Sequence, residues 1–227
     1  MIKVKICGLT NRKDAMNAFT YGADFLGFVF IRNTPRYRDD LREIVKDISK
    51  EVENSVSRVG LFRNEGIEEI VDTVSYCGLD YVQLQGEETP GYCEDLRNEL
   101  DDRCNNRIKI IKAIKVKPAE GRLVSTAYAY DEYVHADLFV FDTYHPELPG
   151  GTGIKFDEKA VMDERDRIQK RFFMAGGLNP TNVAEVVKKV RPYGVDVSSG
   201  VESSVGVKDG NLIKEFIRNA KTKQDPR

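Results

Sequence analysis

The fold class that the sequence predicts is α/β, with eight strand–helix units closing into a single-domain (β/α)₈ TIM barrel. Short β-rich runs alternate with helical patterns from end to end. The runs recur at roughly 25–30 residues, the size of a βα unit, and eight of them fit within the 227 residues. The predicted strands are Ile2–Cys7, Phe25–Phe30, Val56–Phe62, Tyr81–Leu84, Ile108–Ile114, Leu138–Phe141, Phe172–Ala175 and Val195–Val197.

The helices are predicted from apolar stripes at i, i+3, i+4 and i+7. The stripes are Ile67-Ile70-Val71-Val74, Val183-Val186-Val187-Val190 and Leu212-Ile213-Phe216-Ile217-Ala220. Asn179-Pro180 and Thr89-Pro90 each place a cap before a proline at the first helical position, and Gly22 and Gly78 lie where helices end. A further helix is expected between Ile114 and Leu138, where the pattern is weakest.

An open doubly wound sheet is the competing fold. It usually has fewer strands, and its dinucleotide-binding form carries Gly-x-Gly-x-x-Gly after the first strand, a motif that is missing here. We therefore expect one barrel domain over residues 1–220, followed by a charged tail at 221–227.

Composition narrows the function. The 35 basic and 37 acidic residues form no basic stripe, so a nucleic-acid partner is not expected. No apolar run reaches membrane-spanning length, and a strand pattern starts at once, so we expect neither a membrane association nor a signal peptide. Four cysteines without a C-x-x-C pair, and only two histidines, argue against zinc and a disulfide framework. The expected location is the cytoplasm.

The first strand carries the most informative pattern. Alternation puts Ile2, Val4 and Ile6 on a face that helices should cover, and Lys3, Lys5 and Cys7 on the other. A cation one pleat away stabilises a thiolate, and Asn11 is the predicted N-cap of the next helix, with Asp14 three residues on. Cys7 is therefore a candidate catalytic thiol; the alternative is a buried cysteine that packs as a small hydrophobe.

Functional residues of such barrels gather at the carboxyl ends of the strands. Asp142 ends an apolar run, so partial desolvation should raise its pKa and suit it to general-acid catalysis, unless it only caps the next loop. Arg36 suits a ligand carboxylate or phosphate, or pairs with Asp39 or Asp40.

Glycines follow the last two strands, where barrels often bind phosphate. Gly177, Ser199 and Gly200 are small enough for backbone N–H groups to approach an anion, although tight turns alone would explain them. Gly150–Gly153 follows the long loop 143–149 and is either a ligand-closing segment or an ordinary hinge.

Taken together, several segments in collinear order resemble the phosphoribosylanthranilate isomerases, a family of (β/α)₈ barrels in tryptophan biosynthesis that use no cofactor. The segments are Lys5-Ile6-Cys7-Gly8, Pro35-Arg36-Tyr37, Val59-Gly60-Leu61-Phe62, Val82-Gln83-Leu84-Gln85-Gly86-Glu87, Gly150-Gly151-Thr152-Gly153 with Phe156-Asp157, Ala175–Val183 and Val195–Glu202. The resemblance implies an Amadori rearrangement of N-(5-phosphoribosyl)anthranilate to the 1-deoxyribulose isomer. It also implies a small phosphorylated substrate, no metal, and a monomer or homodimer.

Residue roles also follow from the resemblance. Cys7 matches the general base, Asp142 the general acid, and Arg36 the residue that holds the anthranilate carboxylate; Lys5 is expected to keep Cys7 ionised if its ammonium points into the barrel. The expected substrate-binding residues are Arg36, Gln85, Gly153, Gly176, Gly177, Ser198, Ser199 and Gly200.

Two positions depart from the family pattern, and two other functions compete. Gln85 stands where histidine is usual, and Glu158 where tryptophan usually follows Phe156-Asp157. Glutamine cannot titrate near neutrality, so Gln85 either only orients the substrate or marks a different proton path. An indole-glycerol-phosphate synthase would need a catalytic lysine and glutamate that we do not find beside Cys7. A barrel that only binds a phosphorylated sugar would need neither Cys7 nor Asp142.

Overall fold

The computed structural model describes residues 1–52, 55–104, 107–117, 122–125, 128–142, 161–162 and 165–222. Predictions for Gly150–Gly153, Phe156-Asp157, Glu158 and the last five residues of the tail lie outside these residues. Among the helices in the described part of the chain, none has both the length and the apolar composition to cross a bilayer.

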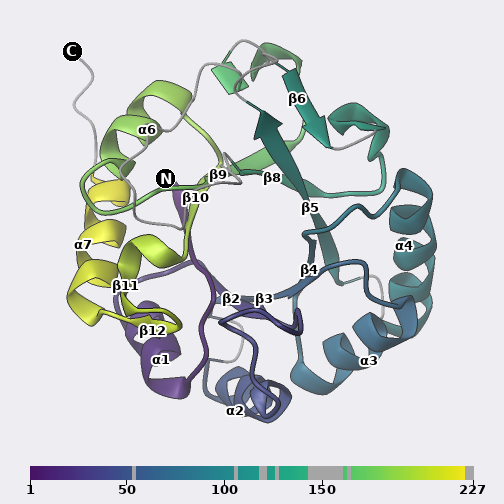
Figure 1. Cartoon of the computed structure of the whole chain (residues 1–227), viewed down its shortest axis with the longest axis horizontal. Helices are drawn as coiled ribbons and strands as arrows, with labels where there is room; N and C mark the ends of the chain where they lie inside the picture. The colour runs from purple at the N-terminus through teal and green to yellow at the C-terminus, as the bar shows by residue number, and fades with distance from the viewer. Residues whose placement is uncertain are drawn as a thin grey trace.

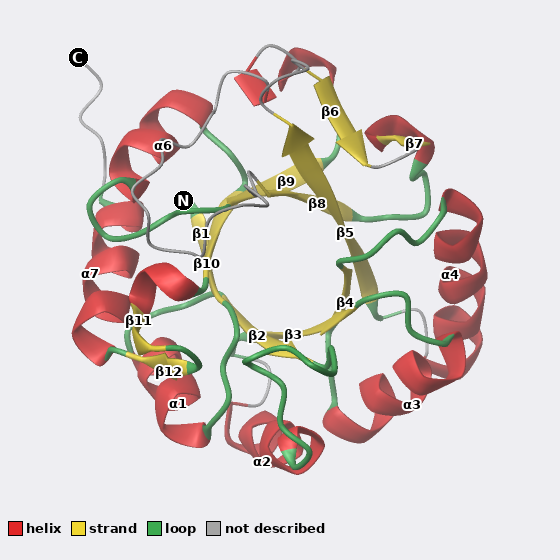
Figure 2. Ribbon diagram, in the orientation of Figure 1, coloured by secondary structure: helices red, strands yellow, loops and turns green. Residues whose placement is uncertain are grey.

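Parallel strands form a closed ring, and helices surround it (Figure 1 and Figure 2). Around the ring the order is β1, β2, β3, β4, β5, β8, β9 and β10, and β10 pairs with β1 to close it. The ring strands are β1 (Lys3–Ile6), β2 (Phe25–Val29), β3 (Ser57–Phe62), β4 (Tyr81–Leu84), β5 (Lys109–Lys117), β8 (Leu138–Asp142), β9 (Arg171–Ala175) and β10 (Gly194–Val197). All eight predicted strands are present, which confirms the (β/α)₈ barrel.

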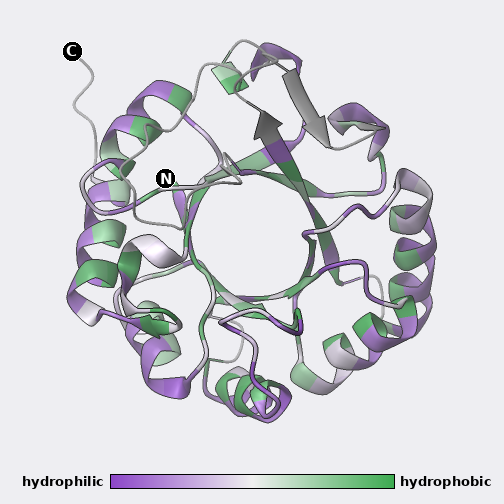
Figure 3. Cartoon of the chain, in the orientation of Figure 1, coloured by the Kyte–Doolittle hydropathy of each residue, from purple (hydrophilic) through white to green (hydrophobic). Residues whose placement is uncertain are grey.

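The α-helices described are α1 (Arg12–Thr20), α2 (Leu41–Val52), α3 (Ile67–Cys77), α4 (Pro90–Cys104), α6 (Val183–Val190) and α7 (Gly210–Lys221). Short 3₁₀ turns lie at η2 (Tyr130–Glu132), η3 (Arg165–Arg167) and η4 (Ser199–Val201). The predicted stripes are the buried faces of α3, α6 and α7. Figure 3 shows hydrophobic and hydrophilic bands alternating along these helices, as the stripes require.

The chain has two apolar cores, separated by the sheet. The outer core lies between strands and helices and contains Val4 and Ile6. The inner core fills the barrel and contains Cys7, Phe25 and Phe173. Because successive side chains of a strand point to opposite faces, the first strand sends its aliphatic residues outward and its lysine and thiol inward, as predicted.

The helix expected between Ile114 and Leu138 is wrong for the described residues. There β6 (Arg122–Ser125) pairs antiparallel with β5, and β7 (Tyr128–Ala129) pairs with β6. Apolar and charged residues alternate from Ile114 to Lys117, a period of two that carries β5 beyond its predicted end. The extended strand then offers backbone groups to the segment that follows, which pairs with it instead of forming a helix.

The helix after Asn179-Pro180 also begins later than predicted, at Val183. The Asn179 side chain still accepts hydrogen bonds from the Thr181 backbone N–H (2.8 Å) and hydroxyl (2.6 Å). Asn179 therefore caps a turn that precedes the helix, and Asn182 occupies the N-cap position of α6.

Candidate active site

Cys7 lies at the carboxyl end of β1, inside the barrel. Its backbone N–H donates to the Val197 carbonyl (2.8 Å), and its side chain is only 6% exposed. Asn11 caps α1 as predicted, accepting from the Asp14 N–H at 2.9 Å. Gly27 on the neighbouring strand makes room for the thiol, because a Cβ there would lie 2.9 Å from the Cys7 Sγ. The turn after β1 therefore fixes the thiol at the mouth.

Lys5 is the centre of a buried polar cluster below the thiol. Its side chain has no exposed area, and its Nζ donates to the Asp196 Oδ2 (2.7 Å), the Gln83 Oε1 (2.8 Å) and the Cys7 Sγ (3.4 Å). Burial is the largest single effect on the pKa of Lys5 and lowers it, but Asp196 and Cys7 together raise this pKa above its ordinary value. The ammonium therefore stays charged inside the barrel.

The ionisation of Cys7 differs from the expectation. Burial raises the pKa of the Cys7 thiol and outweighs Lys5, which lowers it; Asp196 raises it further. The pKa lies above its ordinary value, so Lys5 does not keep the free protein's thiol ionised. Much of the Lys5 charge is balanced by Asp196, which explains why one close cation is insufficient.

Asp142 lies at the carboxyl end of β8, paired in register with Lys115 of β5 and Ala175 of β9. Burial raises the pKa of Asp142 to about 6, helped by the negative charge of Asp196 and opposed by Lys5 and Lys115. The direction is the one predicted for a partly desolvated carboxyl. The same Lys5–Asp196 pair acts on the pKa of Cys7, so the thiol and the carboxyl share one electrostatic environment.

Arg36 pairs with Glu202, a residue distant in sequence. Its Nε and Nη2 donate to the two Glu202 carboxylate oxygens at 2.7 Å each, and Glu202 also accepts from the buried Lys208 Nζ (2.7 Å). The alternative partners Asp39 and Asp40 do not take this role; Asp40 pairs with Arg38. Glu202 and Lys208 belong to the hairpin of β11 (Glu202–Ser204) and β12 (Val207–Lys208), which follows the last barrel strand.

The two glycines after β9 have a backbone conformation that favours glycine, and Gly200 after β10 lies where a side chain would not fit. Gly176 and Gly177 have φ values of 88° and 63°, in the region that favours glycine. A Cβ on Gly200 would lie 1.9 Å from the Leu178 carbonyl oxygen, so the two loops touch through backbone. Ser198 receives the Lys208 Nζ on its carbonyl oxygen at 3.1 Å. Gly153, predicted with this group, lies outside the described residues.

Gln85 directly follows the fourth ring strand and contacts Gln83. The Gln83 Nε2 donates to the Gln85 Oε1 at 2.7 Å, and the Gln85 backbone N–H donates to the Phe62 carbonyl (2.8 Å). Gln83 is at an inward-facing position of β4, and Gln85 lies two residues further along, one residue beyond the end of the strand. The polar cluster therefore reaches from β10 through β1 to β4.

Four site residues were not predicted: Gln83, Asp196, Glu202 and Lys208. Gln83 and Asp196 are polar residues at inward positions of otherwise apolar strands. The alternation of inward and outward positions along each strand could therefore have identified both. Glu202 and Lys208 have no comparable local signal, because a hairpin places them against Arg36.

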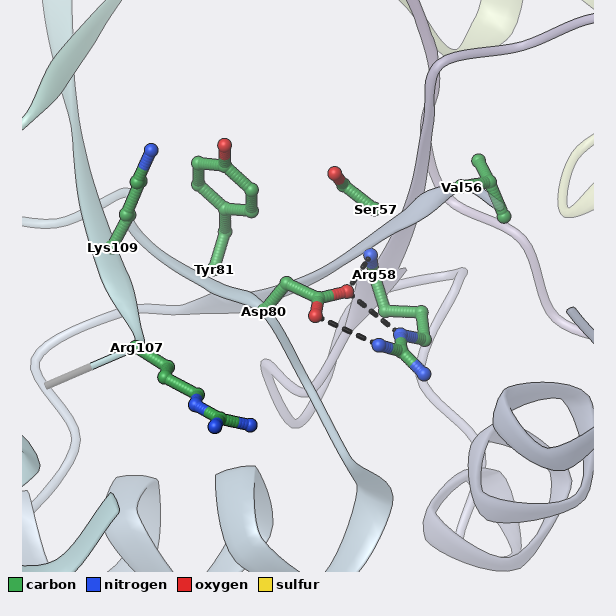
Figure 4. Close-up of a pocket in the computed structure, with 7 residues that line it drawn as sticks. All are labelled: Val56, Ser57, Arg58, Asp80, Tyr81, Arg107 and Lys109. Carbon is green, nitrogen blue, oxygen red and sulfur yellow. Dashed lines mark hydrogen bonds and ion pairs between the residues drawn. The ribbon is translucent and has the colours of Figure 1, made fainter. Parts of the chain in front are cut away.

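A hollow of about 220 Å³ lies at the opposite end of the barrel (Figure 4). Residues at the amino-terminal ends of β3, β4 and β5 line it, including Arg58, Asp80 and Lys109. The Arg58 guanidinium donates to both Asp80 oxygens at 2.7 Å, so these charges satisfy each other. Residues at this end of a barrel contribute to stability more than to chemistry.

A closed parallel barrel that gathers a thiol, a buried lysine and two carboxyls at its carboxyl end is the architecture of a (β/α)₈-barrel enzyme. The family model for N-(5'phosphoribosyl)anthranilate (PRA) isomerase matches residues 4–219. The chain belongs to the N-(5'-phosphoribosyl)anthranilate isomerase family, whose members are intramolecular isomerases of tryptophan biosynthesis.

Individual relatives agree with this assignment. The chain is 42% identical over 221 residues to the N-(5'-phosphoribosyl)anthranilate isomerase of Citrifermentans bemidjiense, across 97% of this chain and 98% of that protein. The crystal structure of the enzyme from Thermotoga maritima matches with a TM-score of 0.81 at 39% identity, covering 97% and 99% of the two chains. A phosphoribosyl anthranilate isomerase in complex with reduced 1-(o-carboxyphenylamino)-1-deoxyribulose 5-phosphate matches with a TM-score of 0.77 at 37% identity and the same coverage.

Proposed function

We propose that this protein converts N-(5'-phosphoribosyl)anthranilate to 1-(2-carboxyphenylamino)-1-deoxyribulose 5-phosphate, with Asp142 as general acid and Cys7 as general base. One observation carries the proposal: both groups end strands of one barrel and both interact with the Lys5–Asp196 pair. A carboxyl with a pKa of about 6 is a better proton donor near neutrality than an ordinary aspartic acid.

The reaction is an isomerisation, so its protons balance without an oxidant. Asp142 gives its proton to the ribose ring oxygen, the C1–O bond breaks, and the nitrogen lone pair forms an iminium at C1. The positive nitrogen makes the C2 hydrogen acidic, and the Cys7 thiolate removes it to give an enolamine. The enol then loses its hydroxyl proton while C1 gains one, which leaves the C2 ketone; through these two transfers Asp142 regains its proton and Cys7 returns to the thiolate. The Lys5 ammonium, 3.4 Å from the Cys7 Sγ, stabilises the thiolate during this step.

Substrate binding is assigned to the remaining mouth residues. Arg36 holds the anthranilate carboxylate: among the described residues Glu202 accepts from its Nε and Nη2, which leaves Nη1 for a ligand oxygen. The backbone at Gly176–Gly177 and at Ser198–Gly200 forms the phosphate cradle, supported by the positive φ values and by the close contact at Gly200. Gln85 contacts the sugar, and Gly153 remains a predicted contact.

Replacement of the two acid–base groups tests this mechanism. Because a positioned proton transfer contributes about 10²–10⁴-fold, Cys7→Ser and Asp142→Asn should each lower kcat by at least about a hundredfold. The fluorescence decay of freshly prepared phosphoribosylanthranilate measures turnover, and calorimetry with the reduced product analogue measures binding, which should be retained.

Cys104→Ser is the matched control. This cysteine lies at the end of α4, with its Sγ 3.6 Å from the Ser75 hydroxyl and far from the mouth, and its variant should keep full turnover. Wild-type kcat in Cys7→Ser would remove the thiol from the mechanism. Analogue binding without turnover by the wild type would instead favour the non-catalytic sugar-binding barrel.

A further inference from the structure

A line of buried hydrogen bonds crosses the barrel interior from β10 to the mouth end of β4. The Asp196 Oδ2 accepts from the Lys5 Nζ (2.7 Å), and the same Nζ donates to the Gln83 Oε1 (2.8 Å). The Gln83 Nε2 then donates to the Gln85 Oε1 (2.7 Å). Lys5 is fully buried and Gln83 is 2% exposed, so water cannot substitute for the two bonds that Lys5 donates, while the Gln83–Gln85 bond is partly buried.

The Lys5 ammonium determines which group donates and which accepts at each hydrogen bond of this line. An ammonium group has donors and no acceptor, so Gln83 must turn its carbonyl oxygen toward Lys5. The Gln83 NH₂ group therefore faces Gln85, whose side-chain carbonyl oxygen accepts the hydrogen bond. A flip of the Gln83 amide would oppose two donors at the buried Lys5, and a flip of the Gln85 amide would oppose two NH₂ groups across a partly buried contact. Within the part of the chain that the structure describes, the Gln85 NH₂ group donates to no acceptor, so the end of the line has a donor available for a ligand.

Gln85 and the thiol both lie at the carboxyl end of the barrel, each one residue beyond the end of its strand, β4 and β1. The step from Lys5 to Cys7 on the first strand is one pleat, and the step from Gln83 to Gln85 on the fourth is also one pleat. Since Lys5 and Gln83 are in contact across the barrel, the residues one pleat above them both reach the mouth. The hydrogen bond from the Gln85 backbone N–H to the Phe62 carbonyl holds Gln85 at this end of the barrel.

We propose that Gln83 is a positioning residue that fixes the polarity of Gln85, so that an amide N–H and not a carbonyl faces the bound substrate. The ligand group at this position is then a hydrogen-bond acceptor, a hydroxyl or ring oxygen of the sugar. Gln85 donates a hydrogen bond and transfers no proton, since a carboxamide does not titrate near neutrality. This inference depends on the proposed function and deepens it.

The polarity can be reversed by one isosteric change. In Gln83→Glu the carboxylate still accepts from Lys5 but cannot donate to Gln85, so the Gln85 amide turns inward and presents its carbonyl to the substrate. The Kd of the reduced product analogue should rise about tenfold, the usual order for a lost hydrogen bond between buried groups. Gln85→Met, which has no donor, should raise the Kd to a similar extent. Gln85→Met should leave thermal unfolding close to that of the wild type, whereas Gln83→Glu adds a buried carboxylate beside Asp196 and should lower the Tm, so the Kd is measured well below the unfolding range of both variants.

A double variant separates polarity from added charge. In the Gln85→Met background there is no amide to turn, so Gln83→Glu should change the Kd less than twofold. A further tenfold loss in that background would mean that the new carboxylate repels the ligand directly and would overturn the proposal. An unchanged Kd in the single variant Gln83→Glu would overturn it as well.

The outcome is distinguishable from a failure of the proposed function. A wild-type protein that neither binds the analogue nor turns over phosphoribosylanthranilate would contradict the function itself. A wild-type protein that does both, with Gln83→Glu indistinguishable from it in Kd, would contradict only the role of Gln83.

Discussion

At the scale of single residues, the proposed general base has a higher pKa than the proposed general acid, which is the reverse of the usual arrangement. The proposed acid, Asp142, has a pKa of about 6, whereas burial raises the pKa of the proposed base, Cys7, above its ordinary value. The active form, with a protonated Asp142 and a Cys7 thiolate, is therefore a small fraction of the protein. That fraction stays constant between the two pKa values and falls outside them.

Because the pKa of Asp142 is the lower of the two, we assign to this residue the acid limb of the pH profile, the fall of kcat/KM at low pH. Below about pH 6 the inactive form with both groups protonated dominates, so kcat/KM should fall about tenfold per pH unit. Lys115→Met removes a cation that lowers the pKa of Asp142, so it should move this limb to higher pH. The pH dependence of kcat/KM for the wild type and the variant checks both statements.

Lys109→Met is the control for that shift. Lys109 begins the same strand at the opposite end of the barrel and lies near the Tyr81 ring. Its replacement should leave the limb in place. An acid limb that is identical in wild type and Lys115→Met would argue that another group, such as the substrate phosphate, produces it.

At the scale of elements, a buried ion pair joins β5 to the loop that follows β4. Lys112 and Glu88 are both almost fully buried, with a 2.8 Å separation between the Nζ and the Oε2. Glu88 also accepts from the backbone N–H groups of Asn64 (2.8 Å) and Gly86 (3.0 Å), and its carbonyl accepts from the Tyr133 hydroxyl (2.9 Å). The loop that carries Gln85 into helix α4 is therefore held from three directions.

Removing one partner of this pair should be costly. Lys112→Met leaves the Glu88 carboxylate buried without its cation, which we expect to lower the free energy of unfolding by about 3–5 kcal/mol. Urea unfolding monitored by circular dichroism measures the change. Adding Glu88→Gln should restore part of the loss, because the remaining amide carries no charge.

Lys50→Met supplies the comparison for an exposed pair. Lys50 and Asp47 are each 67% exposed, at 2.9 Å, so that variant should change stability by no more than about 0.5 kcal/mol. Equal effects for the Lys50 and Lys112 variants would refute the importance of burial.

At the scale of the whole molecule, Asp24 joins the first strand, β1, to helix α7. Its carboxylate accepts from the Lys3 Nζ (2.8 Å) and Val4 N–H (3.0 Å) of the first strand, and from the Lys221 Nζ (2.7 Å) of the last helix. Burial acts to raise the pKa of Asp24, but hydrogen bonds from Lys221, Lys3 and Val4 outweigh it and lower the pKa. Strand pairing between β1 and β10 closes the ring beside this junction.

Asp24→Asn should lower the free energy of unfolding by about 1–3 kcal/mol at neutral pH, because it removes hydrogen bonds to charged groups. A carboxyl whose folded pKa is depressed stabilises the protein above its unfolded pKa, about 3.9, and this stability is lost as the pH falls through the folded pKa. The difference between wild type and variant should therefore shrink in acid. Urea unfolding at pH 7 and near pH 3 tests this, and a pH-independent difference would contradict it.

Local patterns in the chain were sufficient for the barrel and for most of its mouth. Alternation within β1 placed Lys5 and Cys7 inside, and the rule that function lies at strand ends brought Asp142, Arg36 and Gln85 to one face. The barrel prediction succeeds because strand period, helix stripe and chain order are encoded within a few residues, while the site roles of the mouth residues stay predictions. The prediction of a helix after Ile114 is wrong, because the alternation with a period of two continues beyond the predicted end of the strand.

Other properties depend on residues that meet only in the folded barrel. The pKa of Cys7 depends on burial and on Asp196, which lies far along the chain, so a nearby lysine in sequence could not settle its ionisation. The partner of Arg36 is Glu202, and the direction of the Gln83–Gln85 bond follows from Lys5 across the barrel. Desolvation and hydrogen-bond direction are set by three-dimensional surroundings, and a linear pattern contains neither.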